Sequence, residues 1–331
     1  MKKTGFLLLF FFLGASAAYA EEKNETDIRT RVRVEATNAF AASDFAALEK
    51  MADEYRKNKS RTPSGVWKLF LFYDGLTHWL DRVHDEKLIT DAEAKMDSWA
   101  AAYPQSPTPR ITKSMALIRH GWFYRGHSYA DKVPKEAWKP FNDYIALAHA
   151  NLDKCKGIAA GDPQWYQVMM GIAGVESWDR PEFDALFKEA VEHEPYYYRT
   201  YDAALDDLLP KWNGDWIQVD NFVDNAERLT YEKEGHSLYA RLYWYIAETN
   251  GDSEIFKTSL ANWPKMKQGF DDLIQRYPDD WNLNHYLMFA CLASDKPTVH
   301  TLFGRLGTNA MPDALKLVDL QKCRQWANTT P

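Results

Sequence analysis

Residues 165–195 read WYQVMMGIAGVESWDRPEFDALFKEAVEHEP. An aromatic residue opens this segment, Pro181 interrupts it and Pro195 ends it. Proline fits the first turn of a helix but not a helix interior, so Pro181 starts a second helix. Phe187 and Ala190 stand eight and five residues before Pro195. Because residues three apart lie on one side of a helix, we expect both to be buried between neighbouring helices.

The same spacing precedes three further prolines: Pro104, Pro163 and Pro278. The residues eight and five positions before them are Met96 and Trp99, Cys155 and Ile158, and Phe270 and Leu273. Helix starts of the Pro181 kind recur at Thr62-Pro63, Thr108-Pro109 and Val133-Pro134. We find no strand pattern. A mean helix length near 12 residues with short loops predicts an all-α chain of about twelve to sixteen helices.

The segment from Trp165 to Pro195 resembles the tetratricopeptide repeat, which has about 34 residues, an early Trp and the closing pattern A-x-x-x-F-x-x-A-x-x-x-x-P. Phe187, Ala190 and Pro195 match the last three marks, whereas Phe183 replaces the first small residue. The resemblance implies antiparallel helix pairs stacked into an α-α superhelix. Because the prolines are irregularly spaced, we expect this array to be degenerate.

Four strings in a shared order carry a second resemblance. They are Ser64-Gly-Val-Trp-Lys-Leu69, Arg125-Gly-His-Ser-Tyr-Ala130, Leu209-Pro-Lys-Trp-Asn-Gly214 and Trp281-Asn-Leu-Asn284. Together they are similar to an uncharacterised family of exported bacterial tetratricopeptide-like proteins, a domain of unknown function. That resemblance implies the helical-repeat fold. It implies no reaction, so no catalytic residue is carried over.

The first twenty residues have the order of a secretory signal. Lys2 and Lys3 are followed by an apolar run from Gly5 to Leu13 and by Ala18-Tyr19-Ala20. This is the charged, apolar and A-x-A order of a cleavable signal peptide, and the run is too short for a membrane anchor. We expect residues 1–20 to be removed after Ala20. Residues 21–331 would then form a single helical-repeat domain in the periplasm or outside the cell.

Charge and motifs exclude several functions. The formal net charge is −7, and loss of the two signal lysines would make it −9. An acidic protein is poorly suited to nucleic acid or to an anionic lipid surface. The sequence has no G-x-S-x-G, P-loop, Rossmann or metalloprotease motif. We therefore assign no catalytic residue and expect no cofactor, no metal and no stable membrane insertion after signal cleavage.

The three cysteines, Cys155, Cys291 and Cys323, are far apart and form no C-x-x-C motif. The periplasm permits disulfides, but an odd count leaves at least one thiol free in a monomer. Cys155 and Cys291 lie in apolar helical patterns, where a thiol behaves as a small apolar side chain. Burial as free thiols is the simpler expectation, and one bridge is the alternative.

The densest polar and aromatic segment runs from Arg119 to Asp131. Its candidate ligand-binding residues are Arg119, His120, Tyr124, Arg125, His127, Tyr129 and Asp131. They form a cationic island suited to an anionic or carboxylate-bearing partner. One alternative is a metal site on His120, His127 and Asp131. Another is that Gly126 ends the helix and the basic residues cap it.

Three other features bear on a binding surface. Trp212 and Trp216 flank Asn213-Gly214-Asp215 at a helix junction, where at least one indole is expected to be exposed. The segment 239–245 places Arg241 beside aromatics, which suits carboxylate binding, although an ion pair is the simpler expectation. The pair Asp206-Asp207 is typical of a solvated helix face.

Three functions remain open. The first is a periplasmic or secreted scaffold that binds an unknown protein or peptide through a concave surface, as helical-repeat arrays do. The second is an α-helical toroid enzyme acting on glycan or peptidoglycan. The third is a structural part of an envelope or secretion assembly. Two acids with perturbed pKa values in a concave cluster would favour the enzyme over polar and aromatic binding.

Overall fold

The computed structural model describes residues 24–212, 214–311 and 314–329. Over this part the chain forms sixteen α-helices and two short 3-10 helices, with one isolated bridge between Arg61 and Trp67 and no strand. The prediction of an all-α fold is confirmed. The proposed signal peptide at residues 1–20 lies outside the described residues. No described helix is both long and apolar enough to span a bilayer.

The helices follow one another through short loops. Those of the first half are α1 (Glu25–Ala41), α2 (Phe45–Asn58), α3 (Lys68–Thr77), α4 (Glu86–Ala102), α5 (Thr108–Arg125), α6 (Lys135–Ala159), α7 (Pro163–Glu176) and α8 (Arg180–His193). Those of the second half are α9 (Tyr198–Leu208), α10 (Trp216–Glu234), α11 (Ser237–Asn250), α12 (Ile255–Thr258), α13 (Trp263–Arg276), α14 (Asp280–Leu292), α15 (Lys296–Leu306) and α16 (Leu320–Ala327). The 3-10 helices are η1 (His78–Arg82) and η2 (Ala130–Lys132).

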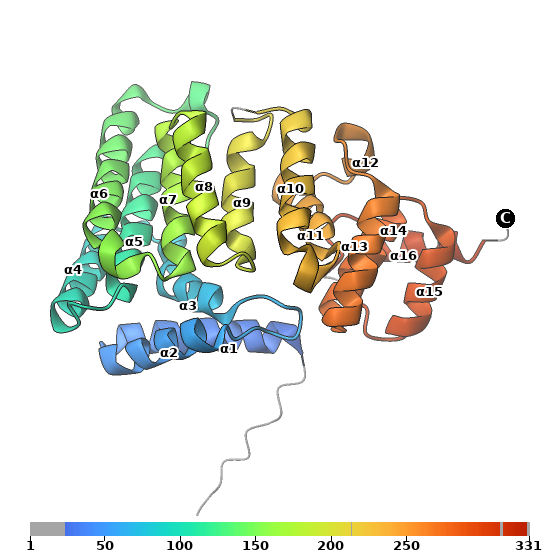
Figure 1. Cartoon of the computed structure of the whole chain (residues 1–331), viewed down its shortest axis with the longest axis horizontal. Helices are drawn as coiled ribbons and strands as arrows, with labels where there is room; N and C mark the ends of the chain where they lie inside the picture. Colours follow the sequence, from blue (N-terminus) through green and yellow to red (C-terminus); the bar gives the residue numbers. More distant parts are fainter. Residues whose placement is uncertain (1–23, 213, 312–313, 330–331) are drawn as a thin grey trace, which may run out of the picture.

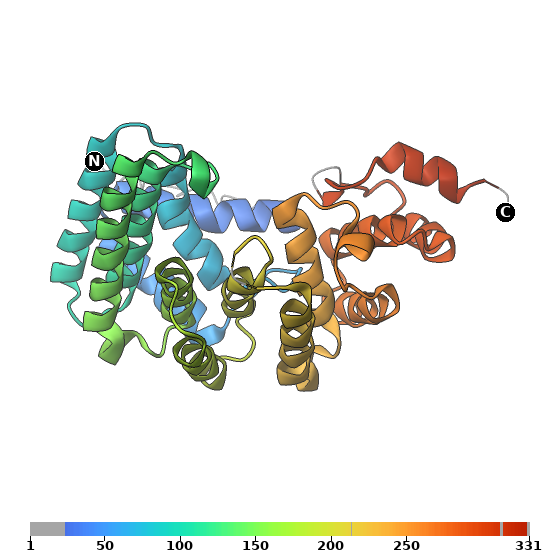
Figure 2. The same cartoon turned by 90° about the horizontal axis from the view of Figure 1, so that it is seen from above.

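The helices are stacked side by side in an array of antiparallel pairs (Figure 1). Residues 165–195 fold as α7 and α8, the pair expected from their sequence. Seen from above, α7, α9 and α11 lie in one row, with α8 and α10 beside them in a second (Figure 2). Helices α1 and α2 cross the ends of this row (Figure 1). The fold is therefore a helical-repeat array with its N-terminal pair turned across the stack.

Acidic and amide side chains start many of these helices. A side-chain oxygen before the first turn accepts a backbone N–H, which satisfies a donor that has no partner within the helix. Residues that cap in this way are Asn24, Asp44, Asp85, Asp162, Asp179, Asp215, Asn262, Asp279, Asp295 and Asp319. Frequent capping accounts for short loops between helices of ordinary length.

The burial that the proline alignment predicts for four residues is confirmed, and seven of the eight aligned positions are buried. Phe187, Ala190, Phe270 and Leu273 are all buried, as are the residues before Pro104. Ile158, which has the same spacing from its proline, is instead 37% exposed. Pro163 begins α7, and the preceding helix ends four residues earlier, whereas the other three helices end two residues before their prolines. This shift in register turns Ile158 towards solvent and buries Ala159 instead.

The helix start expected at Thr62-Pro63 is also wrong, since α3 begins only at Lys68. Residues 60–67 form a loop in which the backbone N–H of Gly65 donates to Thr62. Gly65 has a φ of +92°, which is costly for other residues and breaks the helical path.

The loop 60–67 connects the N-terminal helices to distant parts of the array. Arg241 of α11 and Asn282 of α14 both donate to the carbonyl of Ser64, at 2.6 and 3.2 Å. The indole of Trp67 donates to the carbonyl of Tyr196 at 2.8 Å. These contacts join residues more than 100 positions apart, so the loop ties α1–α3 to α9, α11 and α14.

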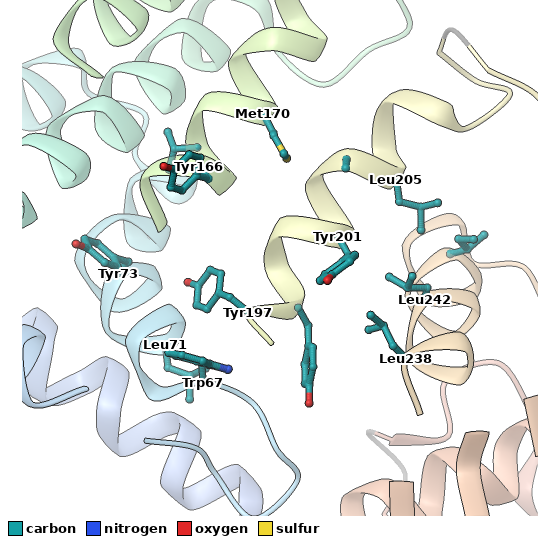
Figure 3. Close-up of a cluster of buried hydrophobic side chains, with 14 of the residues drawn as sticks. Trp67, Leu71, Tyr73, Tyr166, Met170, Tyr197, Tyr201, Leu205, Leu238 and Leu242 are labelled. Carbon is teal, nitrogen blue, oxygen red and sulfur yellow. The ribbon is translucent and has the colours of Figure 1, made fainter. Parts of the chain in front are cut away.

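The core beneath this junction is aromatic. Figure 3 shows Trp67, Leu71 and Tyr73 of the α3 region facing Tyr166 of α7 and Tyr197, which directly precedes α9. All of these side chains are buried. Trp67 and Tyr197 pack edge to face with ring centroids 5.2 Å apart, a favourable arrangement for aromatic pairs. The packing makes α3, α7 and α9 one contiguous support for the surface above them.

A disulfide joins Cys291 at the end of α14 to Cys323 in α16. Cys155 is a buried free thiol, as expected, and burial raises its pKa to about 11. Of the two expectations for Cys291, the structure bears out the bridge. The bond fastens the C-terminal helix to the array.

Candidate functional site

A long groove crosses the face formed by α3, α5, α7, α9 and α11. It has two lobes. The wide lobe has a volume of about 500 Å³ and is lined by α3, α5, α7, α9, the α9–α10 loop and α11. The narrow lobe has a volume of about 180 Å³ and is lined by α1, α3, α9, α11 and α14. Both lobes share Phe70, Arg199, Asp202 and Tyr245, so they form one continuous groove.

The boundary between the lobes is an ordered polar cluster. The guanidinium carbon of Arg199 lies 3.9 Å from the ring centroid of Phe70, and its Nη1 is 2.9 Å from Asp202. Burial raises the pKa of Asp202, and the charge of Arg199 opposes that rise. Arg199 and Asp202 are therefore a paired unit that fixes the middle of the groove.

Asp206 lies one helical turn beyond Asp202 in the wide lobe. Its carboxylate accepts a hydrogen bond from the hydroxyl of Tyr245 at 2.8 Å. Burial raises the pKa of Asp206 to about 6, the Tyr245 hydrogen bond opposes the rise, and the nearby Asp202 charge adds to it. Asp206 thus changes charge close to neutral pH.

The floor of the wide lobe is apolar. Its side chains include Met115, Ile118, Val168, Met170 and Val175. Gly171 and Gly174 of α7 also line it. A side chain added at Gly171 would meet nothing within 4 Å. The absence of side chains at these two positions therefore leaves room for a ligand.

Arginines surround the narrow lobe. Arg29 bonds to Glu25 at 2.5 Å, and its guanidinium carbon lies 4.6 Å from the ring centroid of Trp281. Arg33 pairs with Asp74 at 2.5 Å. Arg241 instead donates to the Ser64 carbonyl. Three of the four arginines that line this lobe, counting Arg199, thus have a carboxylate partner.

Trp244 and Trp281 form the far wall of the narrow lobe, and His285 packs behind them. The imidazole of His285 stacks on Trp244 with centroids 3.8 Å apart and lies 4.9 Å from the ring of Trp281. His285 is buried and is hydrogen-bonded through Nε2 to Glu248 at 3.0 Å. The indole N–H of Trp281 is buried without an acceptor among the described atoms. This packing holds the two indoles in fixed positions beside the groove.

Three charged side chains of the groove differ from their neighbours. One is Lys211, which donates to Asn250 at 2.9 Å and whose charge lowers the pKa of Asp206; the other two are Arg241 and Asp206. Within residues 24–212, 214–311 and 314–329, neither Arg241 nor Asp206 forms an ion pair. The Nε of Arg241 is also buried without an acceptor in that part of the chain. Buried or half-buried charges in proteins are usually paired, so an unpaired cation and an unpaired acid in one groove are unusual.

The residues predicted at 119–131 do not share one surface. Arg119 lines the wide lobe, donates to the Thr77 carbonyl at 2.9 Å and lies 3.4 Å from Asp81. His120 is buried on another side of α5, where it contacts Glu93 at 2.8 Å and stacks on Tyr144.

Helix α5 ends at Arg125, so His120 and His127 do not lie on one continuous helix face. Gly126, with a φ of +69°, is its C-cap. Arg125 is only 8% exposed, and its guanidinium lies between the rings of Trp122 and Trp138. It donates to the carbonyls of Gly126 and Ser128 at 3.1 and 3.3 Å. This matches the packing and capping alternative for Arg125.

The remaining residues of this segment lie away from the groove. Tyr124 donates to Glu86, and His127 is exposed with its ring stacked on Trp122. Tyr129 is 86% exposed. Asp131 is exposed and lies 3.3 Å from Lys132. Across the described residues, no group of three His, Cys, Asp or Glu side chains could hold a metal ion.

The two predicted tryptophans have different environments. Trp212 is 56% exposed and lines the wide lobe, which agrees with the expectation that one of the pair is exposed. Trp216 is partly buried against the core. Asp215 caps α10 as its position suggested, accepting from the N–H groups of Ile217 and Gln218. Asn213 lies outside the described residues.

Most residues of the groove do not stand out in the sequence. The sequence pattern indicated a solvated acidic face for Asp206 and did not single out Arg199, Asp202 or Phe70. The sequence did indicate Arg241 as a candidate for carboxylate binding. The ion pair expected for it as the simpler alternative is not formed with any of the described residues. Tyr239 and Tyr243 are buried on the opposite side of α11. The available signal for Asp202 and Asp206 was the four-residue spacing of two acids on a helix that also carries two tyrosines.

No protein-family profile, curated protein or solved structure matches this chain.

Proposed function

We propose that this protein is an exported binding module that holds a segment of polypeptide in the groove. The observation that carries the proposal is the groove itself, which has an apolar floor, ordered hydrogen-bonding groups and aromatic walls across successive helices. Polypeptide offers the matching chemistry, because apolar side chains alternate with amide groups and charges. Helical-repeat arrays bind their partners on such extended surfaces.

Several features support a peptide over other ligands. The chain is acidic overall, with a net charge of −7, which disfavours nucleic acid. Charge in the groove is mixed, with arginines concentrated in the narrow lobe and Asp202, Asp206 and Asp207 along one side of the wide lobe. Exposed Trp212 and the walls of Trp244 and Trp281 provide the aromatic surface common at interaction hot spots.

Export is part of the proposal. Residues 1–20 have the pattern of a cleavable signal, and the Cys291–Cys323 disulfide is of a kind that persists mainly in oxidising compartments. The expected form is a chain that begins at Glu21 in the periplasm or outside the cell. Intact-mass measurement of the secreted or periplasmic protein tests this, and a chain that retains Met1–Ala20 would contradict it.

Peptide binding is tested with a pool of random octapeptides that have free termini. The pool is equilibrated with the mature protein, and the retained peptides are quantified by mass spectrometry. The same measurement is made on Gly171→Leu, whose new side chain projects into the wide lobe. Because leucine favours a helix more than glycine by up to about 1 kcal/mol, the blocked variant should remain folded.

Gly157→Leu is the matched control. Gly157 is also a helical glycine with nothing within 4 Å of an added side chain, but it lies on α6 outside the groove. The proposal expects retention by the wild type and by Gly157→Leu, with loss in Gly171→Leu. Equal retention by all three proteins would place any binding elsewhere, and no retention by any of them would refute the proposal.

A glycan-acting enzyme is the second candidate, and one observation favours it. Asp202 and Asp206 both lie in the groove with raised pKa values, and the value of about 6 for Asp206 suits a proton donor. However, both acids are on α9, and Asp202 is paired with Arg199. Glycosidases place two carboxylates on opposite sides of the scissile bond.

The enzyme hypothesis is tested by a separate activity measurement. Wild-type protein incubated with peptidoglycan fragments should release new reducing ends, and Asp206→Asn should abolish that release. Release that is absent from the wild type, or unchanged in Asp206→Asn, counts against a catalytic Asp206.

A further inference from the structure

We infer that the groove recognises a short peptide by both of its ends, with the terminal carboxylate at Arg241 and an ammonium group at Asp206. The inference rests on the proposed peptide-binding function and deepens it. Its basis is that these two groove residues are charged, are held in place by hydrogen bonds and form no direct ion pair within the described part of the chain, although the charge of Lys211 acts on Asp206 from further away. A zwitterionic ligand would supply both missing counter-ions at once.

Arg241 is held in place before any ligand binds. One Nη donates to the Ser64 carbonyl at 2.6 Å. The guanidinium carbon lies 5.0 and 5.7 Å from the ring centroids of Tyr198 and Tyr277. Fixing a planar guanidinium in this way lowers the entropy lost when it binds a carboxylate. A carboxylate fits this lobe better than a phosphate for two reasons. The lobe is small, at about 180 Å³, and the Asp202 and Glu248 carboxylates that line it would repel a more highly charged anion more strongly.

Asp206 is positioned in the same manner. The hydroxyl of Tyr245 donates to one of its oxygens at 2.8 Å, and the other oxygen accepts no hydrogen bond from the described residues. The other two acids of α9 already have cationic partners, since Asp202 pairs with Arg199 and Asp207 lies 3.9 Å from Arg180. Asp206 lines the same lobe as the apolar floor, so an ammonium bound there would be partly removed from water. Such charge-assisted hydrogen bonds are stronger than neutral ones.

The separation of the two groups sets the length of the ligand. Arg241 packs against Tyr198 at the start of α9, and Asp206 lies eight residues further along that helix. A rise of 1.5 Å per residue makes this separation about 12 Å. An extended chain covers about 3.3–3.6 Å per residue, so the span corresponds to roughly three or four residues.

Random tetrapeptides in four terminal forms test the inference. The pools have free ends, an acetylated N-terminus, an amidated C-terminus, or both blocks. Retention by the mature protein is measured by equilibrium dialysis and mass spectrometry. The free-ended pool should be retained about tenfold more than either singly blocked pool, the amount expected for one charge-assisted hydrogen bond.

Two variants assign each end to its residue. Arg241→Gln should retain the free and amidated pools equally but still discriminate against acetylation. Asp206→Asn should retain the free and acetylated pools equally but still discriminate against the amidated pool. Arg228→Gln on α10 and Asp184→Asn on α8 are controls, since both residues are exposed and lie outside the groove, and they should behave as the wild type.

The outcomes separate this inference from the proposed function. If octapeptides are retained but the four tetrapeptide pools behave alike, the inference is wrong and peptide binding stands. If either variant changes discrimination at the end assigned to the other, the assignment is wrong. If neither octapeptides nor tetrapeptides are retained, the proposed function fails as well.

Discussion

The hydroxyl of Tyr245 donates to Asp206 at 2.8 Å, which joins α11 to α9 within the wide lobe. Four residues before Tyr245 on α11, Arg241 donates to the Ser64 carbonyl in the narrow lobe. One helix therefore positions a cation at one end of the groove and holds an acid, through Tyr245, towards the other. This geometry underlies both the proposed function and the recognition of peptide ends.

Asp206 should make stability depend on pH. Its pKa is raised from the ordinary 3.8 to about 6 in the folded protein. Folding therefore favours the protonated acid, and stability falls as pH rises from about 4 to 6 and is constant above that. Asp206→Asn should be more stable than the wild type by about 1–2 kcal/mol at pH 7.5, after discounting for solvent, with no difference below pH 4.

Melting curves across pH 3.5–8 measure this difference. Asp184→Asn on α8 serves as the control, because its carboxylate is exposed. A lower melting temperature for Asp206→Asn than for the wild type at pH 7.5 would indicate that the ionised carboxylate is stabilising, which the structure does not support.

The Cys291–Cys323 disulfide should stabilise the C-terminal helices. It links residues 32 positions apart, for which loop-closure entropy suggests about 3–4 kcal/mol. Adding reductant should lower the melting temperature of the wild type but not that of Cys291→Ser. Cys155→Ala, which leaves the bridge intact, should remain sensitive to reductant. Insensitivity of the wild type would show that the bridge does not form in solution.

Gly65→Ala should weaken the junction between the loop 60–67 and α11. Gly65 has a φ of +92°, and an added side chain would lie 2.8 Å from Arg241 and 2.9 Å from Tyr277. Gly126→Ala is a matched control with a similar positive φ of +69° and open space around it. Backbone strain of about 1–3 kcal/mol is common to both variants, so Gly65→Ala should have the lower melting temperature. Equal values would mean that the junction tolerates the contact.

Arg125→Ala should destabilise the protein without affecting peptide retention. The side chain is buried between Trp122 and Trp138 and bonds two carbonyls at the end of α5. Losing these contacts should cost about 1–3 kcal/mol. Unchanged melting together with lost octapeptide retention would instead restore the segment 119–131 as a binding surface.

The sequence was informative where local spacing determines structure. Phe187 and Ala190 are buried because their spacing from Pro195 reflects one helix face. The same argument failed at Ile158, since Pro163 begins a helix instead of following one, and spacing alone does not distinguish the two cases.

The groove depends on contacts that spacing cannot reveal. Arg241 meets Ser64 across 177 positions, and Asp206 becomes half-buried only because α11 packs beside α9. Likewise, Cys323 pairs with Cys291 because the fold brings α16 close to the end of α14, which the spacing of the cysteines in the sequence does not reveal. The cationic segment 119–131 looked like one site because its residues are adjacent, yet helix rotation and the end at Arg125 direct them to different sides.

The most direct test of peptide binding in the groove is the dissociation constant of one retained octapeptide, measured by titration calorimetry. If the octapeptide binds in the wide lobe, Gly171→Leu should raise this constant by at least about tenfold, equivalent to about 1.4 kcal/mol, while Gly157→Leu should leave it unchanged. Both variants should melt at or above the wild-type temperature, because each replaces a helical glycine. The same dissociation constant for the wild type and Gly171→Leu would contradict the account.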